Sequence, residues 1–334
     1  MDGKIKALID NAKKTALGPD ALDRESIIGL LSIETGSEEF EYLGRAARDV
    51  SKLLVLNQAK VGTSIGLDLR PCAASCEFCS LGEKWGLVKG CTELSDETVM
   101  KIIREKNAEG YYQFTLRTTE YYDLERLASL GKKIRENVPG DYYLTANTGE
   151  LTLEDAKHLK ECGYTAVYHV PRLGEGKYTP FSLEERKETM RNAKKGGLML
   201  STGLDPIGIE FTNEELADKI IELRNETPAG ICVMRRESVP GTPLGNMEEI
   251  SDDRLAQIVA VVRLAFKGNL AVHPANKKSI EFGANNAAAE IGATPRLDSD
   301  NLSEWIHRHD DIKKMFLDAG YDLVSKSQYG SKRE

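Results

Sequence analysis

From Val61 onward, short β-prone runs alternate with amphipathic segments, and this alternation restricts the fold more than any other feature of the chain. Helical spacing of apolar residues marks the intervening segments, several of which open with Ser, Thr or Asp followed by acidic residues. Repeated β-then-α units imply a parallel sheet. The predicted strands cover residues 61–69, 111–117, 141–147, 164–170, 197–203, 230–237 and 269–275, and an eighth, short strand is expected near 287–291.

Seven or eight such units favour an α/β fold of the (β/α)8 TIM-barrel type over an open sheet, although periodicity alone leaves the open sheet possible. We predict three segments. Residues 1–60 form an N-terminal helical extension, because apolar residues recur there at helical spacing and Asp23 can cap the second helix. Residues 61–296 form the barrel, and residues 297–334 form a C-terminal helix with a basic tail that we expect to be disordered.

Composition excludes several classes of protein. Apolar residues make up 40% and charged residues 29% of the 334-residue chain, which is typical of a soluble folded protein. The net charge is −8 without a basic stripe, so we expect no nucleic-acid partner. No apolar run approaches the ~20 residues that span a membrane, and the N-terminus lacks a signal-peptide core. We therefore expect a cytoplasmic protein without a membrane partner.

Cys72, Cys76 and Cys79 form a C-x3-C-x2-C motif directly after the first predicted strand. Three thiolates can hold three corners of a [4Fe–4S] cluster and leave the fourth iron open. S-adenosylmethionine carries an amine and a carboxylate that can bind this iron, and one electron then yields a 5′-deoxyadenosyl radical. Phe78 can shield the cluster from water. Buried thiols or a structural zinc site are the alternatives, but zinc sites normally have four ligands.

The segment RPCAASCEFC resembles the signature of the radical S-adenosylmethionine enzymes. The whole chain resembles one branch of them: biotin synthase, the iron-only hydrogenase maturase of the same shape, and methylornithine synthase. The resemblance also rests on DRESIIGLLS, FEYLGRAARDVSKLL, GTPLGN, LAQIVAVVRLAF and FGANNA. The last three are similar to a C-terminal region shared with biotin and thiamine synthesis enzymes. The resemblance implies an electron donor such as flavodoxin or ferredoxin.

The resemblance also implies residues that contact the cofactor. In the family, a motif ending the second strand contacts the amino group of the methionyl end, and Thr118, Thr119 and Glu120 stand in its place. They depart from the usual glycines of the family. Glu175 and Arg186 match an acidic residue and an arginine that follow the fourth strand, and these would hold the amino and carboxylate groups. A solvated helix position is the alternative for Arg186.

Two further parts of the branch can be compared with this sequence. Gly208 and Ile209 resemble a segment after the fifth strand that packs on adenine, although an ordinary loop glycine is the alternative. Biotin synthase keeps a second cluster on inner strands as its sulfur source. At those strands this chain has Thr115, Leu144 and Leu200 or nearby residues, with Asn276 or Lys277 near the place of an arginine ligand. We therefore expect no biotin-type second cluster.

Three cysteines lie outside the motif. Cys162 precedes a strand, so we expect a buried thiol at the opposite end of the barrel. Cys232 lies near the start of the sixth strand, where we expect a core residue. Cys91 lies in the long loop after the motif, and a second cluster that uses this cysteine stays open.

Polar residues fall at the predicted carboxyl ends of the strands, where barrels bind substrates. We select His169, Arg235 and Glu237 as candidate catalytic residues, with structural roles as the alternative. If Arg235 or Arg236 faces the barrel and binds a carboxylate, a small polar, anionic substrate is indicated. The remaining members of the set are Arg117, Asn147, Arg172 and His273.

These features favour a radical enzyme that abstracts hydrogen from a small molecule, in a rearrangement or in biosynthetic carbon chemistry. Sulfur insertion of the biotin or lipoyl type is an alternative that needs a second sulfur source. A non-catalytic iron–sulfur scaffold or electron carrier is the other alternative. The sequence leaves open the substrate, the oligomeric state, and whether S-adenosylmethionine is consumed or regenerated.

Overall fold

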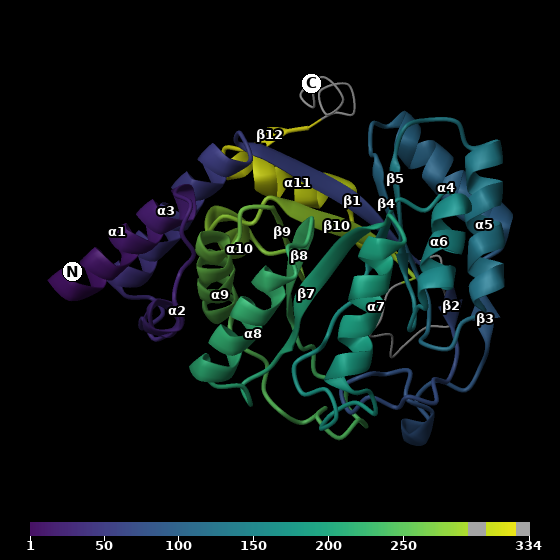
Figure 1. Cartoon of the computed structure of the whole chain (residues 1–334), viewed down its shortest axis with the longest axis horizontal. Coiled ribbons are helices and arrows are strands. Elements are labelled where there is room, and N and C mark those ends of the chain that lie inside the picture. Colours follow the sequence, from purple (N-terminus) through teal and green to yellow (C-terminus); the bar gives the residue numbers. More distant parts are fainter. Residues whose placement is uncertain (293–304, 325–334) are drawn as a thin grey trace.

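Eight parallel strands form a closed barrel in the computed structural model, which describes residues 1–292 and 305–324. Each strand pairs with the next one along the chain, and the last strand pairs with the first, which closes the ring. Figure 1 shows this ring with helices around it. The barrel strands are β1 (Gln58–Gly66), β4 (Gln113–Arg117), β5 (Tyr143–Asn147), β6 (Ala166–Tyr168), β7 (Met199–Ile207), β8 (Gly230–Arg235), β9 (Asn269–His273) and β10 (Asn286–Ile291). The predicted TIM-type barrel is therefore confirmed.

Helices on the outside of the barrel bury one apolar face against the strands. Three of them begin with reciprocal capping boxes, in which Thr152, Ser182 and Thr212 accept from the backbone and acidic side chains three residues later bond back. The helices after the strands are α4 (Asp96–Ala108), α5 (Leu124–Asn137), α6 (Leu153–Glu161), α7 (Leu183–Lys195), α8 (Asn213–Asn225), α9 (Asp252–Ala265) and α10 (Lys277–Glu281).

The N-terminal extension consists of α1 (Gly3–Leu17), α2 (Arg24–Leu31) and α3 (Glu38–Leu54), and it packs against the barrel helix α9. The predicted cap is present, because Asp23 Oδ1 accepts from the Ser26 N–H at 2.7 Å. Residues 255–265 of α9 are buried all round, since strands cover one side of this helix and the extension covers the other. The boundaries of the three predicted segments stay a prediction.

The chain after β10 returns to the barrel through β11 (Trp305–His307), α11 (His309–Asp318) and β12 (Asp322–Leu323). Helix α11 packs on β1 and β10, and β12 pairs with the start of β1. These two short strands, and the small sheet of β2 (Asp68–Leu69) and β3 (Thr92–Glu93), are absent from the prediction because two or three residues carry no period-two pattern. The tail expected to be disordered lies outside the described residues. No helix in the described ranges is long and apolar enough to cross a membrane.

Candidate active site

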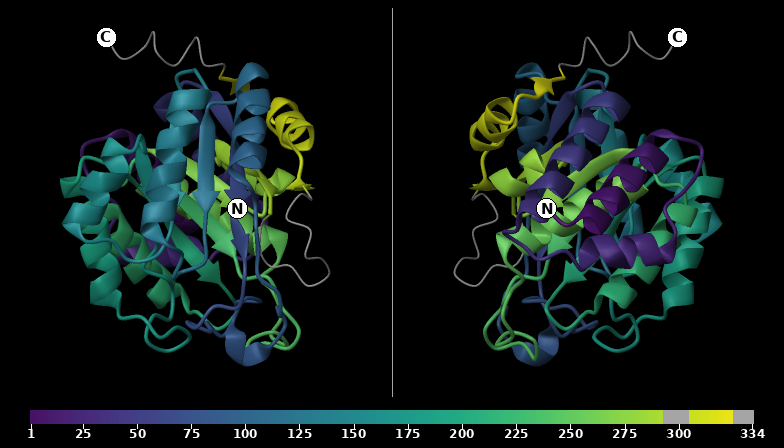
Figure 2. Two further views of the ribbon diagram at one scale, coloured as in Figure 1. Left: turned by 90° about the vertical axis from the view of Figure 1, so that its right-hand side faces the viewer. Right: turned by 90° about the vertical axis from the view of Figure 1, so that its left-hand side faces the viewer.

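The three motif cysteines lie on the loop between β2 and β3, at the carboxyl ends of the barrel strands. Neighbouring loops hold this loop in place: the Glu77 N–H donates to Tyr178 O at 2.9 Å, and Glu77 O accepts from the Leu244 N–H at 3.1 Å. Figure 2 shows the loop after β2 beside the loop after β8 at this end of the barrel. The motif therefore faces the mouth of the barrel, as its place in the sequence predicts.

Backbone hydrogen bonds fold the motif into a compact loop. Cys72 N–H donates to Leu81 O at 2.6 Å, and Cys79 N–H donates to Cys76 O at 2.9 Å. Gly82 has no room for a side chain, since an added Cβ would lie 2.2 Å from the Trp85 ring nitrogen. That nitrogen donates to Cys76 O at 3.3 Å. The loop thus holds its three thiols on one wall of a cavity of about 260 Å³.

The thiols suit a multi-iron cluster better than a single ion. Among the described residues, no group of three or more His, Cys, Asp or Glu side chains is placed to hold one metal ion. The thiols of all three motif cysteines nevertheless line the same cavity, together with Phe78. Burial raises the pKa of Cys76 to about 12, although Arg172 opposes this, and burial also raises the pKa of Cys79. Thiolates at these positions therefore need the positive charge that iron would supply.

Thr118, Thr119 and Glu120 follow β4 and line the same cavity, as the resemblance implies. Thr119 is held by Asp68, whose carboxylate accepts from the Thr119 N–H at 2.8 Å and from its hydroxyl at 2.6 Å. The Thr118 hydroxyl donates to Thr119 O at 2.9 Å. These two threonines are therefore used chiefly in shaping the loop, and the carboxylate of Glu120 is left to face the cavity.

Arg186 is the centre of a buried charge network behind the motif. Its guanidinium is 1% exposed, and its Nη1 lies 2.8 Å from both Glu120 Oε1 and Glu150 Oε1. Gly149 permits this arrangement, because a Cβ there would lie 2.2 Å from Glu120 O. Phe181 stacks on the guanidinium, with its ring centroid 3.8 Å from Cζ. The structure therefore excludes a solvated helix position for Arg186.

Glu175 lies behind Arg186 rather than in the cavity wall, and its side chain is 1% exposed. It accepts from the Arg172 N–H at 3.0 Å and from the Thr179 hydroxyl, and it lies 3.4 Å from Arg186 Nε. Within the described residues, Arg186 Nη2 has no hydrogen-bond partner. Arg186 lines the cavity, and this donor is still without a partner, so the site fits a ligand that brings a carboxylate.

His169 is 3% exposed, and its Nε2 lies 3.3 Å from Glu150 Oε2. Thr189 also donates its hydroxyl to Glu150. Burial alone would raise the pKa of Glu150, but the hydrogen bond and charge of His169, with Thr189 and Arg186, lower it to about 2. His169 therefore supports the Arg186 network instead of standing alone in the cavity.

Gly208 and Ile209 lie outside the lining of this cavity, and Ile209 is 52% exposed. Strand β7 runs on to Ile207, four residues beyond its predicted end, so the loop begins later than expected. Asp205 and Pro206 line the cavity in their place. Burial raises the pKa of Asp205 to about 6, while Arg172 opposes the rise. The expected adenine contact at Gly208 and Ile209 therefore has no support in the cavity lining.

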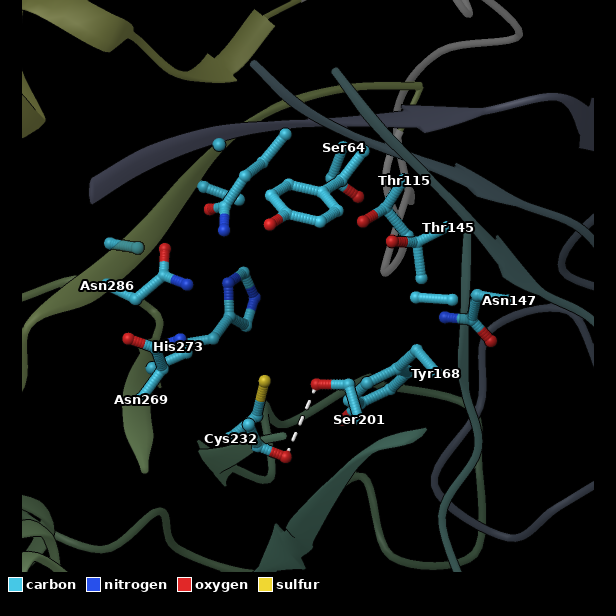
Figure 3. Close-up of a pocket in the computed structure, with 18 of the residues that line it drawn as sticks. Ser64, Thr115, Thr145, Asn147, Tyr168, Ser201, Cys232, Asn269, His273 and Asn286 are labelled. Carbon is cyan, nitrogen blue, oxygen red and sulfur yellow. Dashed lines mark hydrogen bonds between the residues drawn. The ribbon is translucent and has the colours of Figure 1, made fainter. Parts of the chain in front are cut away.

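A second cavity of about 260 Å³ fills the barrel interior and shares residues with the first, including Asn147 and Tyr168. We call this second cavity the lumen and the first the upper chamber. Figure 3 shows hydroxyl and amide side chains from several strands pointing into the lumen. The labelled polar residues there are Ser64, Thr115, Thr145, Asn147, Tyr168, Ser201, Asn269, His273 and Asn286.

The two remaining candidate catalytic residues, Arg235 and Glu237, line the upper chamber. The guanidinium of Arg235 binds residues on its outer side, with Nη1 2.8 Å from Asp252 Oδ1 and Nε 3.4 Å from Glu249 Oε2. The carboxylate of Glu237 lies 4.0 Å from His273 Nε2. The structure therefore places Glu237 closer than Arg235 to the junction of the two cavities.

Of the three inner-strand positions compared with biotin synthase, the one on β5 is one residue away from that expected, and Leu200 on β7 lines the lumen. On β5, Thr145 lines the lumen and its neighbour Leu144 does not, because side chains alternate along a strand. On β7, Ser201 presents its side chain to the lumen beside Leu200. Thr115 lines the lumen as expected.

Cys232 was expected in the core, but it lines the lumen as the third residue of β8. Burial raises the pKa of this thiol to about 12. Cys162 ends α6 and contacts His158, and it is half-buried where a buried thiol was expected. Cys91 is exposed beside β3. Among the described lumen residues, Cys232 is therefore the one cysteine.

Three carboxylates of the site were missed in the sequence. Glu150 follows β5 by three residues, Asp205 lies within a strand, and Glu290 lies in β10. An acidic residue just beyond a strand end was a usable signal for Glu150. Asp205 lies beyond the predicted end of its strand, and the strand that contains Glu290 was predicted only approximately. The sequence therefore did not indicate that either side chain points inward.

No family model matches the chain. It is 21% identical over 329 residues to biotin synthase of Clostridioides difficile strain 630, covering 96% of this chain and 100% of the relative. It is 26% identical to biotin synthase of Clostridium botulinum strain Hall, covering 93% of this chain and 98% of the relative.

Solved structures support the same branch at the level of the fold. Methylornithine synthase superposes with a TM-score of 0.81 at 18% identity and covers 97% of this chain and 99% of its own. The hydrogenase maturase HydG of Carboxydothermus hydrogenoformans superposes with a TM-score of 0.80 at 17% identity, covering 99% of this chain and 81% of its own. The branch that the motif and its flanking segments predicted is confirmed.

Proposed function

We propose that this chain, an enzyme of the radical S-adenosylmethionine class and of the biotin synthase-like type, acts on a small polar molecule held in the barrel lumen. Its cofactors are a [4Fe–4S] cluster and S-adenosylmethionine. When bound, they supply a 5′-deoxyadenosyl radical that abstracts hydrogen from carbon. The observation that carries the proposal is the lumen itself, a cavity below the cysteine motif that is lined by both polar and apolar residues.

The chain's own residues divide this work between them. Cys72, Cys76 and Cys79 hold the cluster, and Phe78 covers it from water. Arg186, with its Nη2 unbonded, binds a carboxylate of the cofactor, and Glu120 binds its amino group. Glu150 and Glu175 fix the guanidinium in position from behind.

At the junction of the cavities, His273 Nε2 lies 3.5 Å from Glu290 Oε2 and 4.0 Å from Glu237 Oε1. Arg117 Nη1 lies 3.1 Å from Glu290 Oε1. These groups orient the substrate below the upper chamber, and His273 can hold a proton at Nε2 between the two carboxylates. A rearrangement or other carbon chemistry needs no second cluster.

Sulfur insertion is the second candidate function, because the curated relatives are named biotin synthase. Against it, Thr115, Thr145 and Ser201 line the inner strands, where a second cluster would need thiolate ligands. A hydroxyl is a poor ligand for such a cluster. We therefore favour chemistry with a single cluster. A flavodoxin or ferredoxin as electron donor and a location in the cytoplasm belong to the same proposal.

Anaerobic reconstitution followed by iron analysis tests these functions. About four irons per chain, together with 5′-deoxyadenosine after addition of S-adenosylmethionine and dithionite, would support the single-cluster enzyme. Appreciably more iron would favour sulfur insertion. About four irons without any 5′-deoxyadenosine would contradict the enzyme and favour an iron–sulfur scaffold.

A further inference from the structure

The middle of the lumen is built from small side chains. Thr115, Thr145, Ser201 and Ala271 occupy positions on four different strands, and a cavity of about 260 Å³ remains between them. The interior of a TIM barrel is normally filled by bulky branched residues. The missing volume in this barrel therefore belongs to a ligand, and not to packing.

The walls of this cavity favour a ligand that forms many hydrogen bonds. Hydroxyl groups of Ser64, Thr145 and Ser201 and the amides of Asn147 and Asn286 point into it (Figure 3). The Ser201 hydroxyl donates to Gly230 O at 3.3 Å and can still accept a bond from a ligand. An apolar ligand would supply no partner to this set of polar groups, whereas a molecule with several hydroxyl or amino groups would.

The charges at the mouth of the lumen decide the sign of the ligand's charge. Carboxylates of Asp205, Glu237 and Glu290 line the mouth. Arg117 is paired with Glu290. Arg172 lies in the field of Asp205 first, and then of Cys76, Glu175 and Glu120.

Arg235, which the sequence suggested as a carboxylate-binding group, is already bound to Glu249 and Asp252. The carboxyl pKa of Glu237 is raised by burial and then by the nearby charges of Glu249 and Glu290, while Arg235 and Arg117 oppose the rise. An added cation would relieve the repulsion that remains among these carboxylates.

We infer that the lumen binds a small, hydroxylated amine, with the ammonium group at the mouth beside Glu237 and Glu290 and the hydroxyl groups below. The inference rests on one part of the proposed function, which is that the substrate binds in the lumen. It replaces the anionic substrate that the sequence suggested with a cationic one.

Three linear six-carbon molecules test this assignment, because they differ mainly in charge: glucamine is a cation, sorbitol is neutral and gluconate is an anion. The full chain with reconstituted cluster is titrated with each at pH 7. Isothermal titration calorimetry measures the affinity for each of the three molecules. We expect glucamine to bind about tenfold more tightly than the other two.

The variant Glu237→Gln should lose most of this tenfold preference. Glu97→Gln, on the exposed side of α4, is the control and should retain it. Tighter binding of gluconate than of glucamine, or no measurable binding of any of the three, would overturn the inference, and both outcomes are read in the unmodified chain.

Measuring 5′-deoxyadenosine in the same samples tests the proposed function separately from this inference. Formation of 5′-deoxyadenosine together with a preference for gluconate would overturn the charge assignment alone. A preference for glucamine without 5′-deoxyadenosine would overturn the proposed function and support the charge assignment.

Discussion

The upper chamber and the lumen have similar volumes but are built in opposite ways. In the upper chamber, loops after the strands bring charged groups together. Arg186, for example, lies beside the carboxylates of Glu120, Glu150 and Glu175. In the lumen, the strands themselves supply hydroxyl and amide groups, and the charges are confined to its mouth. The upper chamber thus suits an invariable charged cofactor, and in the proposed function the lumen selects the substrate.

Replacing a motif cysteine should have the largest effect and should affect the upper chamber alone. Cys76→Ala removes one of the three thiolates, so we expect loss of the cluster and at least a hundredfold loss of 5′-deoxyadenosine formation. Iron content and product are measured in one anaerobic preparation. Cys232→Ala in the lumen is the matched control and should keep both. Retained cleavage in Cys76→Ala would contradict the assignment of the motif.

Removing the central cation of the upper chamber should have the next largest effect. Arg186→Met leaves the buried carboxylates of Glu120, Glu150 and Glu175 without their shared partner. We expect the free energy of unfolding to fall by about 3 kcal/mol, and the affinity for S-adenosylmethionine to fall more than tenfold. Urea denaturation and calorimetric titration measure the two effects.

Arg191→Met on the same helix is the control for this change, because Arg191 forms an exposed ion pair with Glu184. We expect a change of about 0.5 kcal/mol or less there. Equal effects of the two substitutions would mean that Arg186 has no special place in the chamber.

A change in the lumen wall should spare the chemistry of the upper chamber. Thr145→Val keeps the side-chain shape and removes one hydroxyl, so we expect about a fivefold loss of glucamine affinity, near 1 kcal/mol. Iron content and the affinity for S-adenosylmethionine should stay unchanged. Thr92→Val in the small sheet outside the barrel is the control. Loss of the cluster in Thr145→Val would contradict the division between the two cavities.

The smallest effect that we predict is a difference in pH dependence between two carboxylates. The folded-state pKa of Glu150 is lowered to about 2, below its ordinary value of 4.5. Its ionised form therefore stabilises the fold above pH 4.5, and this contribution is lost as the pH falls from about 4.5 to about 2. Because its side chain is 35% exposed, we expect only about 1 kcal/mol.

Glu237 has the opposite sign, because its folded-state pKa is raised. Its ionisation disfavours the fold, and this cost begins as the pH rises through the ordinary carboxyl value. Glu150→Gln should therefore destabilise the protein at pH 7 and do so less at pH 4, whereas Glu237→Gln should not destabilise it at pH 7. Unfolding free energies at the two pH values test this, and parallel behaviour of both variants would contradict it.

The sequence predicted the barrel and the cysteine motif well, because both rest on local patterns. All eight strands lie close to their expected positions, and Cys72, Cys76 and Cys79 occupy the expected loop. The lumen was predicted poorly. An error of one residue turns a side chain to the opposite face of a strand, which is why Leu144 was considered in place of Thr145.

The charge partners of the site could not be predicted from the sequence for a different reason. Glu150 and Arg186 are 36 residues apart along the chain, and Arg117 and Glu290 are 173 residues apart. Only the closure of the barrel brings such pairs together. The expected contact at Gly208 and Ile209 had no support, since β7 ends four residues later than predicted.

Iron analysis of a chain in which Cys72, Cys76 and Cys79 are all replaced by alanine tests the central claim most directly. If the upper chamber holds the cofactor cluster and the lumen is reserved for substrate, this variant should retain only background iron after anaerobic reconstitution. Retention of about two or four irons per chain would show a second cluster elsewhere, and would contradict the account of the lumen as a substrate cavity without a metal cluster.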